Sequence, residues 1–375
     1  MSPFGDRRET PRELVSIAVR EAISSVDKGL APKEIQEAWV GSLGMGGYQL
    51  GNTGTLAVEA VGLHEVPARR VENACASSGY AFRDAYLAVR SGARDVALVV
   101  GVEKMNDLSR PHQRYWLGVS GDTEWERTAG LTFPGVYALM ARRHMFEYNT
   151  KPEHLAAVAV KNHANGALNP KAQFQKVITP EKALGSAFVC DPLRLFDCCS
   201  TTDGAAAVIV AEESVAKKLT DAPVWIEGSG VSSDALAAYR RDSMTRIDAT
   251  TRASREALRM AKRELRDIHV AEVHDCFTIA EILALEDLGY CEKGQGGPLA
   301  ASGATARDGK HPINPSGGLK AKGHPLGATG AGQIYELFHQ LRGSAGPRQV
   351  KGAHRALAHN VGGSGASCAV HVLGV

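Results

Sequence analysis

One cysteine and its flanking residues carry the clearest chemical signal in the chain. Residues 70–73 have strand character, Cys75 follows, and residues 80–89 show a helical pattern after a run of small residues. This order predicts a strand-to-helix turn with the Cys75 sulfur near a helix N-terminus, where unpaired amides and the helix dipole favour an anion. We therefore expect a nucleophilic thiol with a lowered pKa. The alternative is a small core residue, because cysteine is often buried.

Three further segments hold residues that can work with such a thiol. His324 stands between Gly323 and Pro325 in the glycine-rich loop 314–330, which constrains its backbone and presents its side chain as a general base. His274 and Cys276 lie where a predicted strand (269–274) gives way to a predicted helix (278–288), a usual position for α/β sites. Residues 359–365 form a glycine turn whose amides can face a ligand oxygen.

Each of these segments also has a purely structural interpretation. The histidines can bond to backbone, the cysteine can fill the core, and the glycine turn can simply join two strands. Taken together, however, the groups suit acyl transfer through a thioester. One thiolate takes up the acyl group, a second group moves a proton on the adjacent carbon, and amide or imidazole donors hold the oxyanions.

The elements that position these groups alternate between strands and helices. In the first half, Thr10 and Pro11 begin a helix, residues 37–41 form a strand, and the apolar runs 95–101 and 204–210 are buried strands. Between these runs, residues 105–195 are more polar and indicate an inserted lobe with helices at 136–148 and 152–164. The second half predicts strands at 224–227 and 269–274, helices at 251–265, 278–288 and 333–341, and two terminal strands. Residues 203–210 resemble residues 364–372, which indicates an imperfect duplication with an α/β layered fold.

The composition narrows the class of protein. The chain has 375 residues, 44% apolar content and a net charge of +2, which does not favour binding to nucleic acid or to a membrane surface. Seven scattered cysteines without a CxxC pair indicate reduced thiols, a cytoplasmic location and no metal site. No apolar run reaches the length of a membrane-spanning helix.

In this order, the four segments resemble the four active-site loops of the thiolase superfamily. Residues 314–330 follow the pattern NxxGGxxxxGHPxGxxG, and residues 274–277 read HDCF, as in sterol-carrier-protein-type thiolases and archaeal acetoacetyl-CoA thiolases. At the fourth loop, His359 and Asn360 stand where most thiolases have a cysteine, a departure that HDCF members share. Two features of the middle of the chain, Lys161-Asn-His and Asp197-Cys-Cys-Ser-Thr-Thr-Asp-Gly, extend the resemblance over nearly the whole chain.

The resemblance implies a five-layered αβαβα thiolase fold built from two similar halves, residues 1–222 and 223–375. The inserted loop lobe at about residues 105–195 would cover the coenzyme A site. Family members open with a strand before a segment like residues 1–5 of this chain. The first strand of the N-terminal half is therefore expected to be absent here.

The resemblance also implies a role for each group. Cys75 would carry the acyl group, His324 would take its proton and help an oxyanion hole, His274 would donate to the thioester oxygen, and Cys276 would be the acid and base at the α-carbon. The expected second oxyanion hole comprises the amides of Cys75 and of Val361 or Gly362. The expected substrate-binding residues are Asn314, Gly323 and Asn360. Cys198 and Cys199 would pack or line the pantetheine pocket, and His112, Arg114, Arg142 and Arg143 are candidates for the CoA phosphates.

The implied reaction is thiolysis of a 3-ketoacyl-CoA or the Claisen condensation of two acetyl-CoA molecules. CoA would be substrate and product, with no permanently bound cofactor. A homodimer or tetramer is expected, and a small OB-fold/zinc-ribbon protein is a candidate partner. The competing functions are a ketosynthase-like condensing enzyme, a steroid side-chain retro-aldolase, a thiolase-like subunit acting on bulkier steroid or branched acyl-CoA, and a non-catalytic acyl-CoA-binding scaffold in a multi-enzyme complex.

Overall fold

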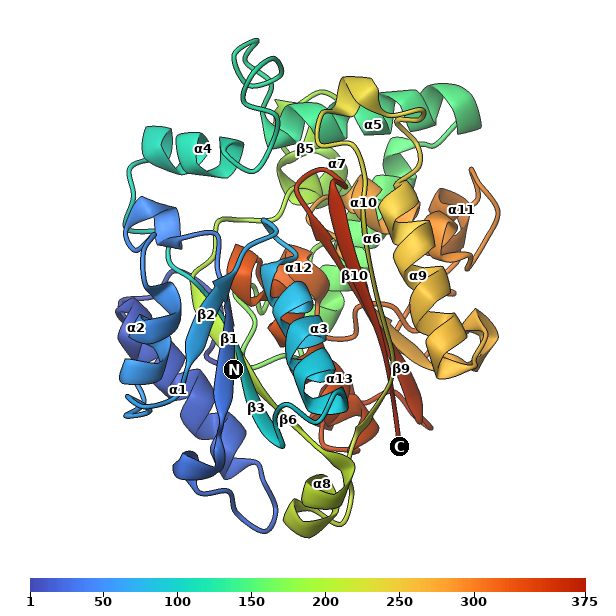
Figure 1. Cartoon of the computed structure of the whole chain (residues 1–375). Helices are drawn as coiled ribbons and strands as arrows, with labels where there is room; N and C mark the ends of the chain where they lie inside the picture. Colours follow the sequence, from blue (N-terminus) through green and yellow to red (C-terminus); the bar gives the residue numbers. More distant parts are fainter.

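The computed structural model describes all 375 residues and contains two four-stranded sheets with a pair of helices between them (Figure 1). The first sheet consists, in spatial order, of β2 (Ala68–Val71), β1 (Glu37–Gly41), β3 (Val96–Glu103) and β6 (Gly204–Ala211). The second sheet consists of β7 (Trp225–Ser233), β10 (Ser367–Gly374), β9 (Arg355–Gly362) and β8 (Val270–Glu272). In each sheet one strand near the end, β6 or β10, runs antiparallel to its neighbour, as expected for a duplicated unit.

Helices complete five layers and confirm the predicted αβαβα fold. The first sheet is covered on its outer face by α1 (Pro11–Ser24) and α2 (Thr53–Glu59). The central layer consists of α3 (Ser77–Arg90) and α13 (Thr329–Leu341), which pack against each other and against both sheets. The second sheet is covered by α9 (Asp248–Ala261), which packs on α10 (Thr278–Leu288). The remaining short helices are α8 (Glu213–Leu219), α11 (Gly296–Ala301) and α12 (Gly318–Ala321).

The inserted lobe is present between β3 and β6. It comprises α4 (Arg110–Gly118), α5 (Phe133–Tyr148), α6 (Pro152–Gly166), α7 (Pro180–Leu184), β4 (Phe188–Cys190) and β5 (Leu193–Arg194). Figure 1 shows α4 and α5 beyond one end of the layered core, and α5 shares a hydrophobic cluster with α10. The predicted division at residues 222 and 223 falls in the link between α8 and β7.

The largest difference between a predicted and an observed boundary concerns β7, which was expected at residues 224–227 and extends to Ser233. Gly228 and Gly230 interrupt the apolar pattern, so the sequence gives a weak strand signal there. These glycines serve packing, because a Cβ atom on Gly228 would lie 2.1 Å from the Ala257 carbonyl oxygen of α9. The helix therefore rests directly on the backbone of the strand. The predicted helix at 251–265 begins and ends earlier, at Asp248 and Ala261.

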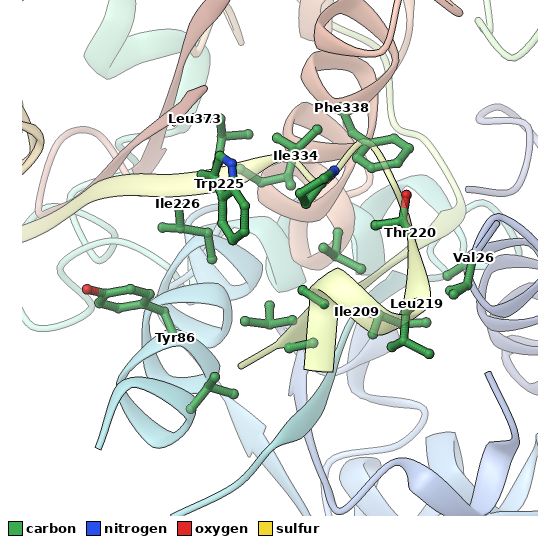
Figure 2. A pocket seen from close by; sticks show the side chains of 18 of the residues that line it. Val26, Tyr86, Ile209, Leu219, Thr220, Trp225, Ile226, Ile334, Phe338 and Leu373 are labelled. Atoms are coloured by element: carbon green, nitrogen blue, oxygen red, sulfur yellow. The ribbon is translucent and has the colours of Figure 1, made fainter. Parts of the chain in front are cut away.

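β6 is the edge strand of the first sheet. The segment from Met1 to Gly5 runs along the start of β6, where the Ser2 amide donates to the Ala205 carbonyl at 2.8 Å. Beyond it, the edge of β6 faces an apolar groove of about 810 Å³. Figure 2 shows Ile209, Ile226 and Phe338 among the side chains that line this groove.

The groove is separate from the loops that carry Cys75 and His324. Besides parts of α1, β6, α8 and β7, its lining includes later turns of α3 and α13, whereas Cys75 and His324 precede the N-termini of those helices. The Met1 ammonium group is buried at the groove and pairs with Glu21 at 2.6 Å. Burial lowers the pKa of this amine to about 6. None of the helices is both long and apolar enough to cross a membrane.

Candidate active site

Cys75 lies in a tight turn between β2 and α3, as predicted. Ala74 adopts a left-handed backbone conformation (φ 50°), which is unusual for a residue with a side chain. The turn is held by the Ser77 hydroxyl, which donates to the Ala74 carbonyl at 2.6 Å, and by the Ala76 amide, which donates to the Asn73 carbonyl at 2.9 Å. The fixed turn directs the Cys75 side chain into the protein, where the residue is only 8% exposed.

The expected low pKa of Cys75 is wrong. Burial raises the pKa of the Cys75 thiol above its ordinary value, and the nearby Cys199 and Glu103 act in the same direction. The backbone amides of Gly363 and of Cys75 itself favour the thiolate but do not offset the loss of hydration. The thiol is therefore protonated at rest, and a base must take its proton during attack.

His324 is placed and oriented for that task. Its Nδ1 is 2.7 Å from the Thr329 hydroxyl, which itself donates to the Pro325 carbonyl at 2.9 Å. Since that hydroxyl has given its hydrogen to Pro325, it accepts from Nδ1–H, and the Nε2 atom of His324 keeps its lone pair. Burial lowers the pKa of His324 to about 3, so the ring is a neutral base at physiological pH.

His274 faces His324 edge-on, with ring centroids 5.1 Å apart and an interplanar angle of 84°. Its Nδ1 accepts from the Asn360 amide group at 3.4 Å, which places the ring hydrogen on Nε2. That Nε2 atom is buried and has no hydrogen-bond partner in the protein. Burial, with His324 and His359 nearby, lowers the pKa of His274 well below its ordinary value. The ring is thus a neutral donor available to an oxygen in the site.

Cys75 and the two histidines form a compact group. The coordinating atoms of Cys75, His274 and His324 all lie within 4.8 Å of one another. This spacing also fits a metal ion, for which the sequence predicts no site. Burial raises the pKa of Cys276 well above its ordinary value, with Cys199 and Cys75 as neighbours. Two protonated thiols and two neutral imidazoles therefore surround one reaction space.

The amide of Gly363 favours the thiolate form of Cys75 and lowers the pKa of this thiol, against the larger effect of burial. The sequence placed this donor at Val361 or Gly362, but both residues belong to β9, where they pair with Cys368 and Ser367 of β10. The turn begins at Gly363, although the sequence predicted a glycine turn from residue 359. The sequence shows the glycine pair 362–363, but it does not show that β9 ends at Gly362.

The comparisons with known proteins agree with this arrangement. Residues 1–214 match the family model "Thiolase, N-terminal domain", and residues 229–375 match "Thiolase C-terminal domain-like". The chain belongs to the thiolase family. It is 46% identical to an acetyl-CoA acetyltransferase of Methanothermobacter thermautotrophicus over 96% of this chain and 95% of that protein. It is 36% identical to sterol carrier protein 2 of Gallus gallus over 91% of this chain and 64% of that protein.

A solved structure supports the same family assignment. The Ltp2-ChsH2(DUF35) aldolase matches this thiolase with a TM-score of 0.86 and 25% identity, over 100% of this chain and 95% of that chain. Both the fold and the family of the chain are therefore those that its four active-site loops indicated.

Two of the expected substrate-binding residues of this thiolase have other tasks in the structure. The Asn314 side chain accepts from the Val273 amide at 2.8 Å and donates to Glu281 at 2.9 Å, so it supports the loop that carries His274. Gly323 has φ 120°, and a Cβ atom there would lie 2.8 Å from the Thr202 methyl group. Both residues shape the site, and neither offers a free polar side-chain atom to a substrate.

Asn360, the third expected binding residue, connects the catalytic loops. Its amide group donates to the Cys75 carbonyl at 2.9 Å as well as facing His274. His359, which precedes it, accepts from the His274 amide at 3.3 Å and lies 2.9 Å from the Thr250 hydroxyl. The two residues that replace the usual cysteine therefore position Cys75 and His274.

The structure also shows the surroundings of the Cys198-Cys199 pair and of the basic residues considered for the CoA phosphates. The Cys199 amide donates to the Cys276 carbonyl at 3.0 Å, so the Cys198-Cys199 pair packs on the loop of Cys276. Arg142 pairs with Asp191, and Arg143 pairs with Glu147 at 2.6 Å, which engages both guanidinium groups within the lobe. His112 and Arg114 are exposed on α4. The CoA phosphates therefore have His112 and Arg114 as the freer candidates.

Glu103, at the end of β3, is a buried residue that the sequence analysis missed. Its carboxylate accepts from the amides of Leu43 at 2.9 Å, Met45 at 2.6 Å and Gly327 at 3.1 Å. Burial raises its pKa to about 7. Glu103 thereby fastens the glycine-rich loop 44–47 to the loop that carries His324.

We expect Glu103→Ala to destabilise this thiolase by about 3 kcal/mol, because three buried amides lose their acceptor. Thermal unfolding of the purified variant measures the effect. Glu59→Ala is the control, since Glu59 forms a half-exposed pair with Arg12 at 3.0 Å and such pairs contribute little. Equal unfolding midpoints for the two variants would contradict the anchoring role of Glu103.

Proposed function

We propose that this thiolase cleaves short-chain 3-ketoacyl-CoA with CoA, or condenses two acetyl-CoA molecules in reverse, through an acyl group carried on Cys75. The observation that carries the proposal is the group of Cys75, His274 and His324 atoms within 4.8 Å of one another, with Cys276 beside them. The name of the Methanothermobacter relative, acetyl-CoA acetyltransferase, supports a short acyl group. CoA acts as substrate and product, without a permanently bound cofactor.

The first step forms the acyl-enzyme. The Cys75 thiol gives its proton to the free Nε2 of His324 while its sulfur attacks the 3-keto carbon. The amides of Cys75 and Gly363, which already point at the sulfur, hold the oxyanion that develops on the neighbouring oxygen. We therefore place Gly363 in the second oxyanion hole, in the role first expected of Val361 or Gly362.

The second step breaks the carbon–carbon bond. The electrons of that bond move to the α-carbon of the leaving acyl-CoA, and the Cys276 thiol gives its proton to that carbon. The free Nε2–H of His274 donates to the thioester oxygen, on which negative charge develops. A CoA thiol then attacks the acyl group on Cys75, and its proton restores the Cys276 thiol. Cys75 leaves as a thiolate and takes back the proton held on His324.

The decisive experiment is a thiolysis assay with purified protein, acetoacetyl-CoA and free CoA, followed through loss of the enolate absorbance. Rapid loss that requires free CoA supports the proposal. Absence of loss with acetoacetyl-CoA, combined with turnover of a bulkier 3-ketoacyl-CoA, would overturn the short-chain assignment. Absence of turnover with any 3-ketoacyl-CoA would favour the scaffold function.

The pH dependence follows from the shifted pKa values. His324, with a pKa of about 3, is already neutral above about pH 4, so it does not lose its function as the pH falls from 8 to 5. The pKa of Cys75 is raised, so thiolate increases with pH beyond the neutral range. We expect the rate of Cys75 alkylation by iodoacetamide to rise steadily from pH 6 to 9. A plateau above an inflection near pH 6–7 would indicate a thiolate–imidazolium pair instead.

Assembly and location form part of the same proposal. β2 lies at the edge of the first sheet, and its Arg69 side chain is 61% exposed, which leaves a strand edge for a second copy in a homodimer. The solved aldolase contains a DUF35 protein, which supports a search for a small OB-fold/zinc-ribbon partner here. All seven cysteines are free thiols, which suits a cytoplasmic location.

A further inference from the structure

A tyrosine of the inserted lobe packs against the loop of Cys276 and the turn at Gly363. Tyr137 lies on α5 and is 1% exposed, although α5 is distant in sequence from every active-site loop. Its ring stacks on Phe277, the residue after Cys276, with centroids 4.5 Å apart and an interplanar angle of 25°. Tyr137, Cys276 and Val361 belong to one hydrophobic cluster. The lobe therefore contributes a side chain to the wall of the reaction space.

The hydroxyl of Tyr137 has two neighbours. It lies 3.3 Å from the carbonyl oxygen of Gly363, a long distance for a hydrogen bond between two oxygens, so its hydrogen is only weakly held there. The Tyr137 ring stacks on Phe277, the residue after Cys276, and the hydroxyl lowers the pKa of the Cys276 thiol. The same hydroxyl is therefore close both to the Gly363 carbonyl and to the thiol proposed to act at the α-carbon.

We propose that the Tyr137 hydroxyl is a positioning group that donates to the Cys276 sulfur whenever Cys276 is a thiolate. The proposal rests on the acid and base role of Cys276 in the proposed function. In condensation, Cys276 as thiolate takes a proton from the methyl group of the second acetyl-CoA, and in thiolysis it becomes a thiolate after protonating the leaving carbon. In both directions the hydroxyl turns from Gly363 to the sulfur, and its own proton stays on its oxygen.

The groups around Cys276 explain why such a donor is needed. Burial removes the hydration of the Cys276 sulfur, and the neighbouring Asp275 carboxylate also disfavours a negative charge there. Lys320 faces Cys198, Cys199 and Asp275, and its ammonium donates to the Cys198 carbonyl at 2.7 Å. Of the groups that contact Cys276, Tyr137 is the one that lowers its pKa. Burial holds the pKa of Tyr137 well above its ordinary value, so it remains a donor at every working pH.

The test compares wild type with Tyr137→Phe, which removes the hydroxyl and keeps the stacked ring. Two rates are measured over a range of pH: deuterium uptake from D₂O into the methyl group of acetyl-CoA, which reports on Cys276, and acetylation of Cys75 by acetyl-CoA. We expect deuterium uptake to fall about tenfold to a hundredfold at pH 7, the effect of losing one hydrogen bond to a charged atom. Its pH profile should move to higher pH, and Cys75 acetylation should stay within about twofold.

Tyr290→Phe is the matched control, because the Tyr290 hydroxyl is also buried but has no hydrogen-bond partner. It should leave both rates and the pH profile unchanged. An unshifted pH profile of deuterium uptake in Tyr137→Phe would overturn the proposal. An equal fall of both rates, together with a lower unfolding temperature, would also overturn it, because that result indicates a structural role for Tyr137. If wild-type protein acetylates Cys75 but takes up no deuterium, the Cys276 assignment fails first, and the role of Tyr137 fails with it.

Discussion

Cys75→Ala abolishes both thiolysis and condensation, with a fall in kcat of at least about 10⁴-fold, because the variant has no sulfur to carry the acyl group. The structure assigns no substitute at that position. Cys276 and Cys199 are nearby, but the turn held by Ser77 and Ala76 and the amides of Gly363 and Cys75 are arranged around the Cys75 sulfur. The thiolysis assay with acetoacetyl-CoA measures the loss.

Cys291→Ala provides the control for the Cys75 experiment. Cys291 is a half-buried free thiol that follows α10 and lies outside the group of Cys75, His274 and His324. Its removal should leave kcat within about twofold of wild type, since surface and half-buried sites away from the chemistry have small effects. A Cys75→Ala variant that keeps the activity of the Cys291→Ala variant would refute the assignment of the nucleophile.

Cys276→Ala separates the two halves of the reaction. We expect the overall rate to fall about 10²- to 10⁴-fold, the usual contribution of a general acid or base. Formation of the acyl-enzyme from acetyl-CoA should persist, because Cys75, His324 and the Gly363 amide remain in place. The assay measures both quantities on the same sample: turnover of acetoacetyl-CoA and the amount of acetyl group on the protein.

Two results would contradict this division of labour. Wild-type turnover by Cys276→Ala would show that another group moves the proton at the α-carbon, and His274, whose Nε2 has no partner in the protein, is then the next candidate. If Cys276→Ala loses both the acyl-enzyme and turnover, Cys276 is needed before the carbon–carbon bond breaks or forms. Cys276→Ser is a useful companion, because it keeps a proton donor of similar size but much lower acidity.

The sequence predicted the fold because the fold depends on local patterns. The Thr10–Pro11 helix start and the strand from Glu37 to Gly41 were found at their predicted positions. The predicted loops bring Cys75, His274 and His324 together, since each loop precedes a helix or follows a strand at the same end of the molecule.

The features of the site that the sequence did not predict depend on burial and on contacts between residues far apart in the chain. The pKa of Cys75 could not be read from its helix N-terminus, because desolvation outweighs the amides that face the sulfur. Asn314 was taken for a binding residue because its partners, Val273 and Glu281, are known only from the folded chain. Tyr137 gave no signal at all, since its lobe helix has no active-site motif and reaches the thiols only through tertiary packing.

The most direct test of the whole account is to locate the acyl group. Wild type, Cys75→Ala and Cys276→Ala are each mixed with acetyl-CoA, quenched in acid, digested and analysed by peptide mass spectrometry. The account predicts one acetyl group per chain on the peptide with Cys75 in wild type and in Cys276→Ala, and none in Cys75→Ala. An acetyl group on Cys276 or Cys199 in wild type, or no acetyl group on any cysteine, would contradict it.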